Sequence, residues 1–291
     1  MNNWLNISEK KTQKIKAVVS YTFCESGENH VGNQQIGHMV KIGEGFNLDD
    51  FTQAIKKWKF VWKCDSEIEI KFLNRLLPEN VIINTKGEVV NAPNSYVLVL
   101  RNGVNEILKK LGKTQEDLYR EVAKYKWDTK YWDTRRKRVL NKHARSNNVV
   151  ADFDQEANYK EGQGTVVDFK NCPLLSAIRQ GIYELFGEKA KEMIAEGNKY
   201  DDGGEKKHGI GWHGDAERRR VICVRCGAKE SMPMHFRWYY DCKPVGNEIV
   251  IPLNGGDIYI MSEYAVGTNW RHRSKLTLRH ATGASKYIKK D

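Results

Sequence analysis

The stretch Gly209-Ile-Gly-Trp-His-Gly-Asp-Ala-Glu-Arg-Arg-Arg-Val-Ile-Cys-Val-Arg-Cys-Gly227 contains two strand-like runs on either side of a polar turn. Successive residues of a strand project to opposite faces, so His213 and Asp215 would lie on one side and Gly214 on the other. More strand-like runs follow at short, fairly regular intervals, separated by Gly, Asn or Asp, at 234–240, 248–253, 257–261 and 275–278. This spacing is typical of a β-sandwich or a β-barrel.

Before residue 209 the sequence mixes helices and strands. Strand-like runs occur at 17–23 and 95–100, and helical spacing occurs at 47–58, 103–108, 115–125, 174–186 and 188–196. We therefore predict an α+β protein with an N-terminal α/β portion of unknown role at 1–148 and a mostly antiparallel domain at 149–291. The helices within 174–196 would buttress one sheet of that domain, and the N-terminal portion would pack against it.

Cys223 and Cys226 have the spacing of a metal-binding or redox pair. No second pair follows, and a redox pair would be expected to begin a helix, which this β-rich run does not. We therefore favour strand packing for both. All six cysteines are expected to be reduced, because the N-terminal sequence has no secretory signal pattern.

Lysine and arginine outnumber aspartate and glutamate by 48 to 37, which gives a net charge of +11. An excess of this size favours a polyanionic partner. No apolar run approaches the ~18 residues of a membrane-spanning helix, so we expect no membrane association and a cytoplasmic or nuclear location. The sequence has no P-loop, dinucleotide-binding glycine fingerprint or nucleophile elbow, which excludes the enzyme classes that depend on them.

The most basic segment is 135–145, whose cations are Arg135, Arg136, Lys137, Arg138, Lys142 and Arg145. Such a run is either a solvated face or a surface that contacts the phosphates of DNA or RNA. The nearby Trp127, Tyr131 and Trp132 favour the second interpretation, because proteins that bind single strands combine phosphate contacts with stacking on aromatic rings. Both interpretations stay open at this point.

His213 and Asp215 supply two ligands of a two-histidine, one-carboxylate triad. Such a triad binds Fe(II) in non-haem oxygenases and leaves positions open for a keto acid and dioxygen. The His-x-Asp spacing alone is a weak signal, since chance produces it often. Candidates for the remaining ligand are His235, His272 and His280.

Several segments occur around this pair in a specific order. Asn198-Lys-Tyr200 and a glycine turn precede His213-Gly-Asp215-Ala-Glu217, and the segments 220–227, 234–237, 255–262 and 274–280 follow. Over about residues 198–280 the chain resembles the 2-oxoglutarate- and Fe(II)-dependent oxygenase superfamily, specifically its AlkB-like branch. The resemblance implies a double-stranded β-helix (jelly roll), with Fe(II) and 2-oxoglutarate as cofactors and ascorbate as a reductant in assays. It also implies that Asn198 and Tyr200 hydrogen-bond 2-oxoglutarate.

The resemblance places the last iron ligand after the strand that follows Gly256, which disfavours His235. His272 follows Gly256-Asp257 at about the distance along the chain that the superfamily's last iron ligand usually has. In addition, Arg273 and Arg279 are similar to the arginine pair of the AlkB-like branch. However, the few residues between His272 and Arg279 leave almost no room for two strand arms and a turn.

His280 avoids this conflict, and we favour it as the third iron ligand. The segment 282–285 can turn, and 286–290 can form a closing strand in which Lys286, Lys289 or Lys290 faces the distal carboxylate of 2-oxoglutarate. We expect Lys289 and Arg279 to bind the cofactor, although strand alternation turns Arg279 away from an iron held by His280 unless the strand bends. The segment 278–283 is also similar to the C-terminal part of uncharacterised viral members.

The sequence thus predicts a dioxygenase that hydroxylates or demethylates a C–H bond, with His213, Asp215 and His280 as the catalytic iron ligands. A nucleic-acid base is the favoured substrate, and an extruded base needs a pocket. Aromatic residues on strands that could line such a pocket are Trp212, Phe236, Trp238 and Tyr240, although alternation places Trp212 opposite His213. The alternatives are a protein or small-molecule hydroxylase and a catalytically inactive jelly-roll binding protein.

Overall fold

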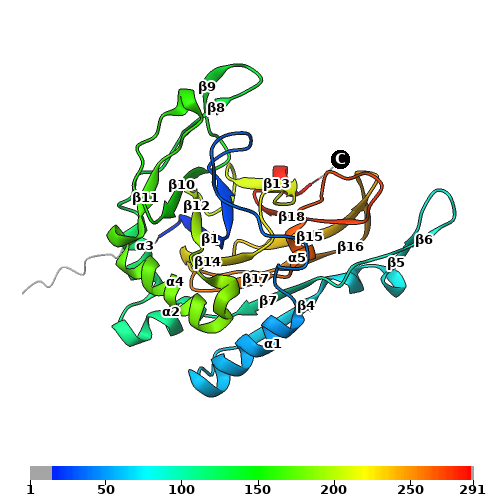
Figure 1. Ribbon diagram of the computed structural model, residues 1–291, viewed down its shortest axis with the longest axis horizontal. Helices are drawn as coiled ribbons and strands as arrows, with labels where there is room; N and C mark the ends of the chain where they lie inside the picture. Colours follow the sequence, from blue (N-terminus) through cyan, green and yellow to red (C-terminus); the bar gives the residue numbers. More distant parts are fainter. Residues whose placement is uncertain (1–14, 290–291) are drawn as a thin grey trace, which may run out of the picture.

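An eight-stranded sheet lies at the centre of the computed structural model, which describes residues 15–289 (Figure 1). Neighbouring strands are antiparallel except for the first pair. In spatial order they are β11 (Val166–Asp168), β10 (Ser146–Ala151), β12 (Ile194–Tyr200), β1 (Val18–Cys24), β14 (Val221–Gly227), β17 (Ile258–Met261), β7 (Tyr96–Leu100) and β4 (Ile68–Phe72). Strands from both sides of residue 148 share this sheet, so the expected division at 148/149 is not a boundary within it.

A four-stranded antiparallel sheet faces one side of the large sheet. Its strands are, in spatial order, β13 (Gly209–His213), β18 (Thr277–Gly283), β15 (Met234–Tyr240) and β16 (Lys243–Ile251). Phe236, Trp238 and Leu278 of the small sheet belong to one buried cluster with Val99 and Met261 of the large sheet. This shared core holds the two sheets together, because burial of each fully enclosed side chain contributes about 1.5–3 kcal/mol.

Helices cover the opposite face of the large sheet (Figure 1). They are α1 (Leu48–Lys56), α2 (Gly103–Leu108), α3 (Gln115–Val122) and α4 (Pro173–Phe186), and two shorter helices, α5 (Glu263–Val266) and α6 (Ser285–Ile288), pack beside β18. The alternation of β14 produces this layering: Ile222 and Val224 join the helix-side core, whereas Val221 and Cys223 face the small sheet. The prediction of an α+β protein is therefore confirmed.

Local signals predicted several elements correctly. Asn47 and Asp50 form a capping box at the start of α1, and Thr114 and Asp117 form another at the start of α3. Gly112 ends the turn after α2 in the left-handed conformation, with φ 61°. Helix α3 ends at Val122, slightly earlier than the expected 125.

Two predictions about local structure are wrong. The segment 188–196 is not a helix: a 3-10 turn at Gly187–Ala190 leads into β12, which pairs with β10 on one side and β1 on the other. The expected closing strand at 286–290 is also absent from the described residues, where α6 follows β18 and Lys290 lies outside that range. Because β1 already occupies the space between β12 and β14, neither of those strands has a free edge there for a C-terminal strand to pair with.

Cys223 and Cys226 lie on opposite faces of β14, in the sheet-side and the helix-side core respectively. Side chains on opposite faces cannot share a metal, so the strand-packing interpretation holds.

Three two-stranded hairpins extend from this core: β2 (Ser26–Glu28) with β3 (Gln35–Gly37), β5 (Val81–Ile83) with β6 (Val89–Asn91), and β8 (Lys130–Asp133) with β9 (Arg138–Asn141). Within residues 15–289, none of the helices has the length and apolar character that crossing a membrane requires.

Candidate metal centre

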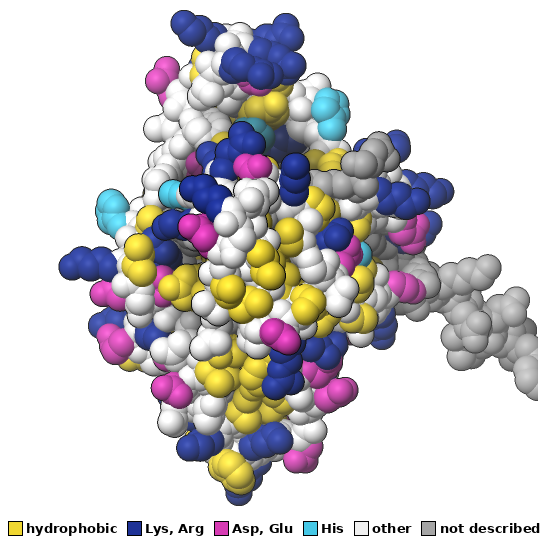
Figure 2. Space-filling view, turned by 90° about the vertical axis from the view of Figure 1, so that its right-hand side faces the viewer, with side chains coloured by type: hydrophobic (Ala, Val, Ile, Leu, Met, Phe, Trp, Pro, Cys, Tyr) yellow, Lys and Arg dark blue, Asp and Glu magenta, His cyan; other side chains and the backbone are white. Residues whose placement is uncertain are grey.

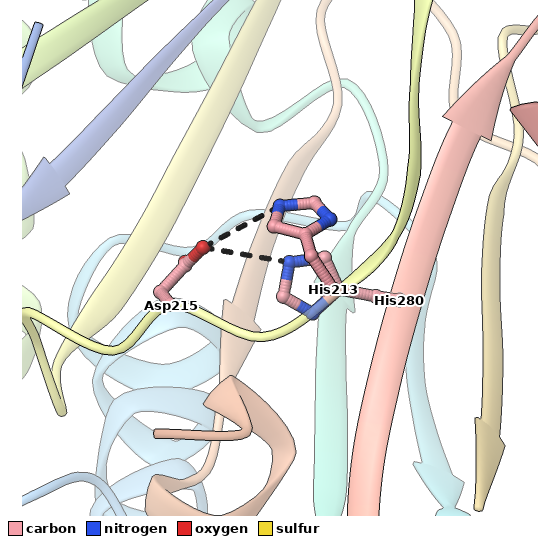
Figure 3. A group of neighbouring side chains, drawn as sticks. All are labelled: His213, Asp215 and His280. Carbon is pink, nitrogen blue, oxygen red and sulfur yellow. Dashed lines mark ion pairs between the residues drawn. The ribbon is translucent and has the colours of Figure 1, made fainter. Parts of the chain in front are cut away.

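His213, Asp215 and His280 converge at one point (Figure 3). His213 ends β13, His280 lies directly opposite it on β18, and Asp215 follows in the next loop. Asp215 Oδ1 is 3.6 Å from His213 Nε2 and 3.7 Å from His280 Nε2. One ligand atom from each residue lies within 4.8 Å of the others, and this is the one group of three potential metal ligands found in residues 15–289.

Gly214 allows the chain to bring both ligands of the His-x-Asp pair to this point. A Cβ atom at position 214 would lie 2.1 Å from the carbonyl oxygen of Gly267 and 2.9 Å from Trp270 Cβ. The backbone of the next residue is held on the same side, because Asp215 N donates a hydrogen bond of 3.1 Å to the carbonyl of Val266. The close contact with the segment after β17 therefore requires glycine.

Hydrogen bonding and electrostatics leave Nε2 of His213 available to a cation. His213 Nδ1 lies 2.8 Å from the carbonyl oxygen of Gly211, to which it can only donate, so Nε2 carries the free lone pair. Burial and the neighbouring His280 lower the pKa of His213 to about 3, so its ring is neutral near pH 7. His280 is 4% exposed, and its Nδ1 is buried without a hydrogen-bond partner.

Arg218 supports the carboxylate of the triad. Its guanidinium is buried, binds Glu196 and Glu217, and has Nε 3.9 Å from Asp215 Oδ2. Burial alone would raise the pKa of Asp215, but Arg218 and the two imidazoles outweigh it and hold that pKa below its usual range. Asp215 is therefore an anion at neutral pH, as a metal ligand must be.

The triad forms part of the wall of a cavity of about 360 Å³ between the two sheets. This volume falls within the range of small-molecule sites, about 300–1,000 Å³. The large sheet contributes Ser20, Thr22, Glu196, Asn198, Tyr200, Val221, Arg225, Tyr259 and Met261 to the wall. The small sheet contributes Ile210, His213, Met234, His280 and Thr282.

Among the predicted cofactor residues, the structure brings Asn198 and Tyr200 into the same cavity as the triad. Arg279 and Lys289 do not line it. Arg279 points to the outer face of the small sheet, where its guanidinium lies 4.2 Å from the centre of the Tyr239 ring, and Lys289 is exposed after α6. Strand alternation accounts for Arg279, since its neighbour His280 faces inward.

The other histidine candidates lie elsewhere. His272 is exposed, and His235 bonds Glu248 at 2.6 Å on the outer face of the small sheet. The aromatic residues expected to line a pocket do not line this cavity: Phe236 and Trp238 are in the core, Trp212 donates to the carbonyl of Ile288, and Tyr240 packs at the edge of that core.

Sequence reasoning did not place Arg145 and Arg225 at this site, although both line the cavity. Arg145 belongs to the basic run 135–145, but its Nε donates to the side-chain oxygen of Asn198. For Arg225 the signal was present, because it is the one charged residue within the apolar strand that continues from Val221. A charge inside a strand buried on both faces needs a partner or a ligand.

The basic run 135–145 divides into two parts. Arg135, Arg136, Lys137 and Arg138 are exposed at the turn of the β8–β9 hairpin, and Figure 2 shows Lys and Arg side chains gathered at the top of the molecule, where Figure 1 places that hairpin. Lys142 instead points inward, with Nζ 3.0 Å from Asn29 Oδ1, and burial lowers its pKa to about 8. Trp127 packs against the helix-side core, so it is not part of an exposed stacking surface.

The sequence matches no protein-family model. It is 37% identical over 276 residues to "Uncharacterized protein R156" of Acanthamoeba polyphaga mimivirus, a match that covers 95% of this chain and 99% of that protein. The chain therefore belongs to the same family as this viral protein. The name of that relative states no activity, so a function for this chain rests on the geometry of the site.

Proposed function

We propose that the protein is a 2-oxoglutarate- and Fe(II)-dependent dioxygenase of the AlkB-like branch. The observation that carries this proposal is the convergence of His213, Asp215 and His280 at the wall of a cavity between two sheets. Two imidazoles and one carboxylate are the donor set of non-haem Fe(II) oxygenases. The ordered sequence segments that resemble this superfamily surround the same three residues.

The arrangement of strands supports the jelly roll that the resemblance implies. Between β12 and β18 the chain alternates between the sheets: β12, β14 and β17 lie in the large sheet, and β13, β15, β16 and β18 lie in the small one. We infer that these strands form the double-stranded β-helix and that β1 completes its larger sheet. Ligands carried by such paired strands are held rigidly, as a pre-organised metal site requires.

The residues present fit Fe(II). His213 Nε2 is free to bind a metal because Nδ1 of the same ring donates to the Gly211 carbonyl. In His280, Nδ1 has no hydrogen-bond partner among the described residues, so no other polar group holds this ring through Nδ1. When bound, Fe(II) and 2-oxoglutarate supply the activation of dioxygen, coupled to oxidation of a substrate C–H bond and conversion of the keto acid to succinate and carbon dioxide.

The chain itself contributes position and charge to this reaction. Arg218 orients the Asp215 carboxylate through the buried network with Glu196 and Glu217. Asn198 is fixed from the other side by Arg145 and Asn147, which both donate to its side-chain oxygen. The amide nitrogen of Asn198 is thereby left to donate to an oxygen of the keto acid, beside Tyr200 on the same strand.

A nucleic-acid base is the substrate that we propose for this site. The supporting observations are the net charge of +11 and the exposed cations of the β8–β9 turn, which suit a phosphate backbone. Mass spectrometry of nucleosides and of proteins after incubation with Fe(II), 2-oxoglutarate and ascorbate tests this choice. If an oxidised product appears only on protein or on a small molecule, the proposed substrate is wrong, whereas the proposed dioxygenase reaction stands.

An anaerobic Fe(II) titration tests the metal site directly. We expect Asp215→Ala and His280→Ala to lose iron binding and 2-oxoglutarate-dependent succinate formation, while His272→Ala, the matched control at an exposed histidine, retains both. Loss of iron only in the His272 variant would refute the ligand assignment. A wild-type protein that binds no Fe(II) would instead be a catalytically inactive jelly-roll binding protein.

A further inference from the structure

We infer that Arg225 and Ser20, on adjacent strands of the large sheet, form a carboxylate-binding subsite that takes the distal carboxylate of 2-oxoglutarate. The identity of the ligand rests on the proposed function. The two cations expected from the sequence, Arg279 and Lys289, lie outside the cavity, so the charge that such a ligand requires must come from another element.

Three residues form a row across the cavity wall. In the register of the sheet, Ser20 of β1 lies opposite Asn198 of β12 on one side and opposite Arg225 of β14 on the other. Residues paired in this way project to the same face, and all three line the cavity. The keto acid would therefore meet an amide, a hydroxyl and a guanidinium in sequence along one wall.

Arg225 is a buried cation that has no counter-ion among the described residues. It is 1% exposed, and its Nη1 donates to the carbonyl of Met232, but its Nε is buried without a partner. Within residues 15–289 it forms no ion pair, whereas Arg218, which is also buried, is paired with Glu196 and Glu217. A guanidinium remains charged in proteins, and burying a charge without a counter-ion costs free energy. The described residues supply no counter-ion for Arg225, so an anionic ligand bound here would offset that cost.

The neighbours of Arg225 are hydrogen-bond donors. Ser20 Oγ is buried and has no partner of normal geometry, although the Cys223 thiol, a weak acceptor, lies next to it. Burial raises the pKa of Tyr200 to about 12, so its phenol stays protonated beside the guanidinium. No acidic side chain pairs with the cation in the described range, and a carboxylate can accept two parallel bonds from a guanidinium.

The backbone keeps this arginine in place. Arg225 N donates to the carbonyl of Asp257 at 3.0 Å, and Gly256 N donates to the carbonyl of Arg225 at 2.9 Å. The strand next to it, β1, comes from the N-terminal part of the chain, so the subsite unites segments about two hundred residues apart. Removing β1 would therefore remove half of the subsite as well as a central strand.

Isothermal titration calorimetry under anaerobic conditions with Fe(II) tests the assignment. The probes are 2-oxoglutarate and pyruvate, which shares the keto-acid end but lacks the distal carboxylate. In Arg225→Met the affinity for 2-oxoglutarate should fall on the order of 100-fold, as expected when a charged hydrogen-bonded pair is lost, with little change for pyruvate. Arg279→Gln and Lys289→Gln are matched controls and should bind both ligands like the wild type.

The ratio of the two affinities is the readout, because both ligands require the same folded protein. Arg225→Met should also keep or raise the ligand-free melting temperature, since it removes an unpaired buried charge. If Arg225→Met does not fold, the ratio is measured in Arg225→Lys, which keeps a cation at the position. We expect the ratio of affinities in Arg225→Lys to lie between the ratio of the wild type and that of a binding-deficient variant.

Each result decides the inference. A wild-type ratio in the Arg225 variants, or a ratio lost in Arg279→Gln instead, overturns the subsite and leaves the proposed function standing. Binding of 2-oxoglutarate that depends on Arg225 without any binding of Fe(II) supports the subsite and overturns the proposed function. A wild-type protein that binds neither keto acid overturns both.

Discussion

Replacing Gly214 with alanine should damage the metal centre through a steric conflict with the backbone. The added Cβ would lie 2.1 Å from the carbonyl oxygen of Gly267 and 2.9 Å from Trp270 Cβ. Non-bonded heavy atoms at contact stand about 3.5 Å apart, so one segment must move by roughly 1 Å. Overpacking of this kind costs about 1–3 kcal/mol, and the upper end applies because the atom that must yield belongs to the main chain.

Chemical denaturation and an Fe(II) titration measure the two consequences of Gly214→Ala. We expect the free energy of unfolding to fall by about 3 kcal/mol, with a decrease in melting temperature on the order of 5 °C for a chain of this length. A displacement near 1 Å also exceeds the ~0.2 Å tolerance of metal–ligand distances, so the affinity for iron should fall at least about 10-fold.

Gly211→Ala is the matched control, at a glycine of β13 just before His213. A Cβ at position 211 would meet nothing closer than the Tyr287 carbonyl oxygen at 3.6 Å, an ordinary contact. Its free energy of unfolding should stay within about 0.5 kcal/mol of the wild type, and its iron affinity should not change. If Gly214→Ala behaves like Gly211→Ala in both measurements, the steric explanation of the His-x-Asp geometry is refuted.

Two further predictions concern the basic run. Burial lowers the pKa of Lys142 to about 8 from its ordinary 10.5. Between these pH values the unfolded chain holds a proton that the folded chain has released, so Lys142 makes stability increase with pH there. Chemical denaturation measures the free energy of unfolding of the wild type and of Lys142→Met, and the difference between the two should increase from pH 8 to 10.5. A difference that stays constant over this range would contradict the prediction. If the β8–β9 turn contacts nucleic acid, its triple glutamine variant should make the log–log salt dependence of binding shallower by up to about 3 units. The exposed cations replaced are Arg135, Arg136 and Lys137. A control variant with the same charge change replaces Lys56, Lys59 and Lys63, and an equal slope in both variants would remove the support for this surface.

Local chemistry in the sequence determined much of the secondary structure. The capping box at Thr114, the glycine at 112 and the apolar alternation after residue 209 act within a few residues, so α3, the end of the helix before it and the C-terminal strands could be predicted. The spacing of His213 and Asp215 is equally local. Their placement on one side of the chain follows from strand geometry together with the small residue between them.

The tertiary structure alone decided which distant segments complete the sheets and the site. The segment that reads as a helix at 188–196 becomes β12 in part because β1 and β10 pair with both of its edges, and pairing between segments so far apart leaves no local pattern in any of them. The same pairing places β1 beside Arg225 and leaves no free edge there for a strand at the C-terminus. His280, and not His272, lies with His213 because the register of β18 against β13 sets them opposite each other. That register also turns Arg279 outward, since one step along a strand reverses the face on which a side chain lies.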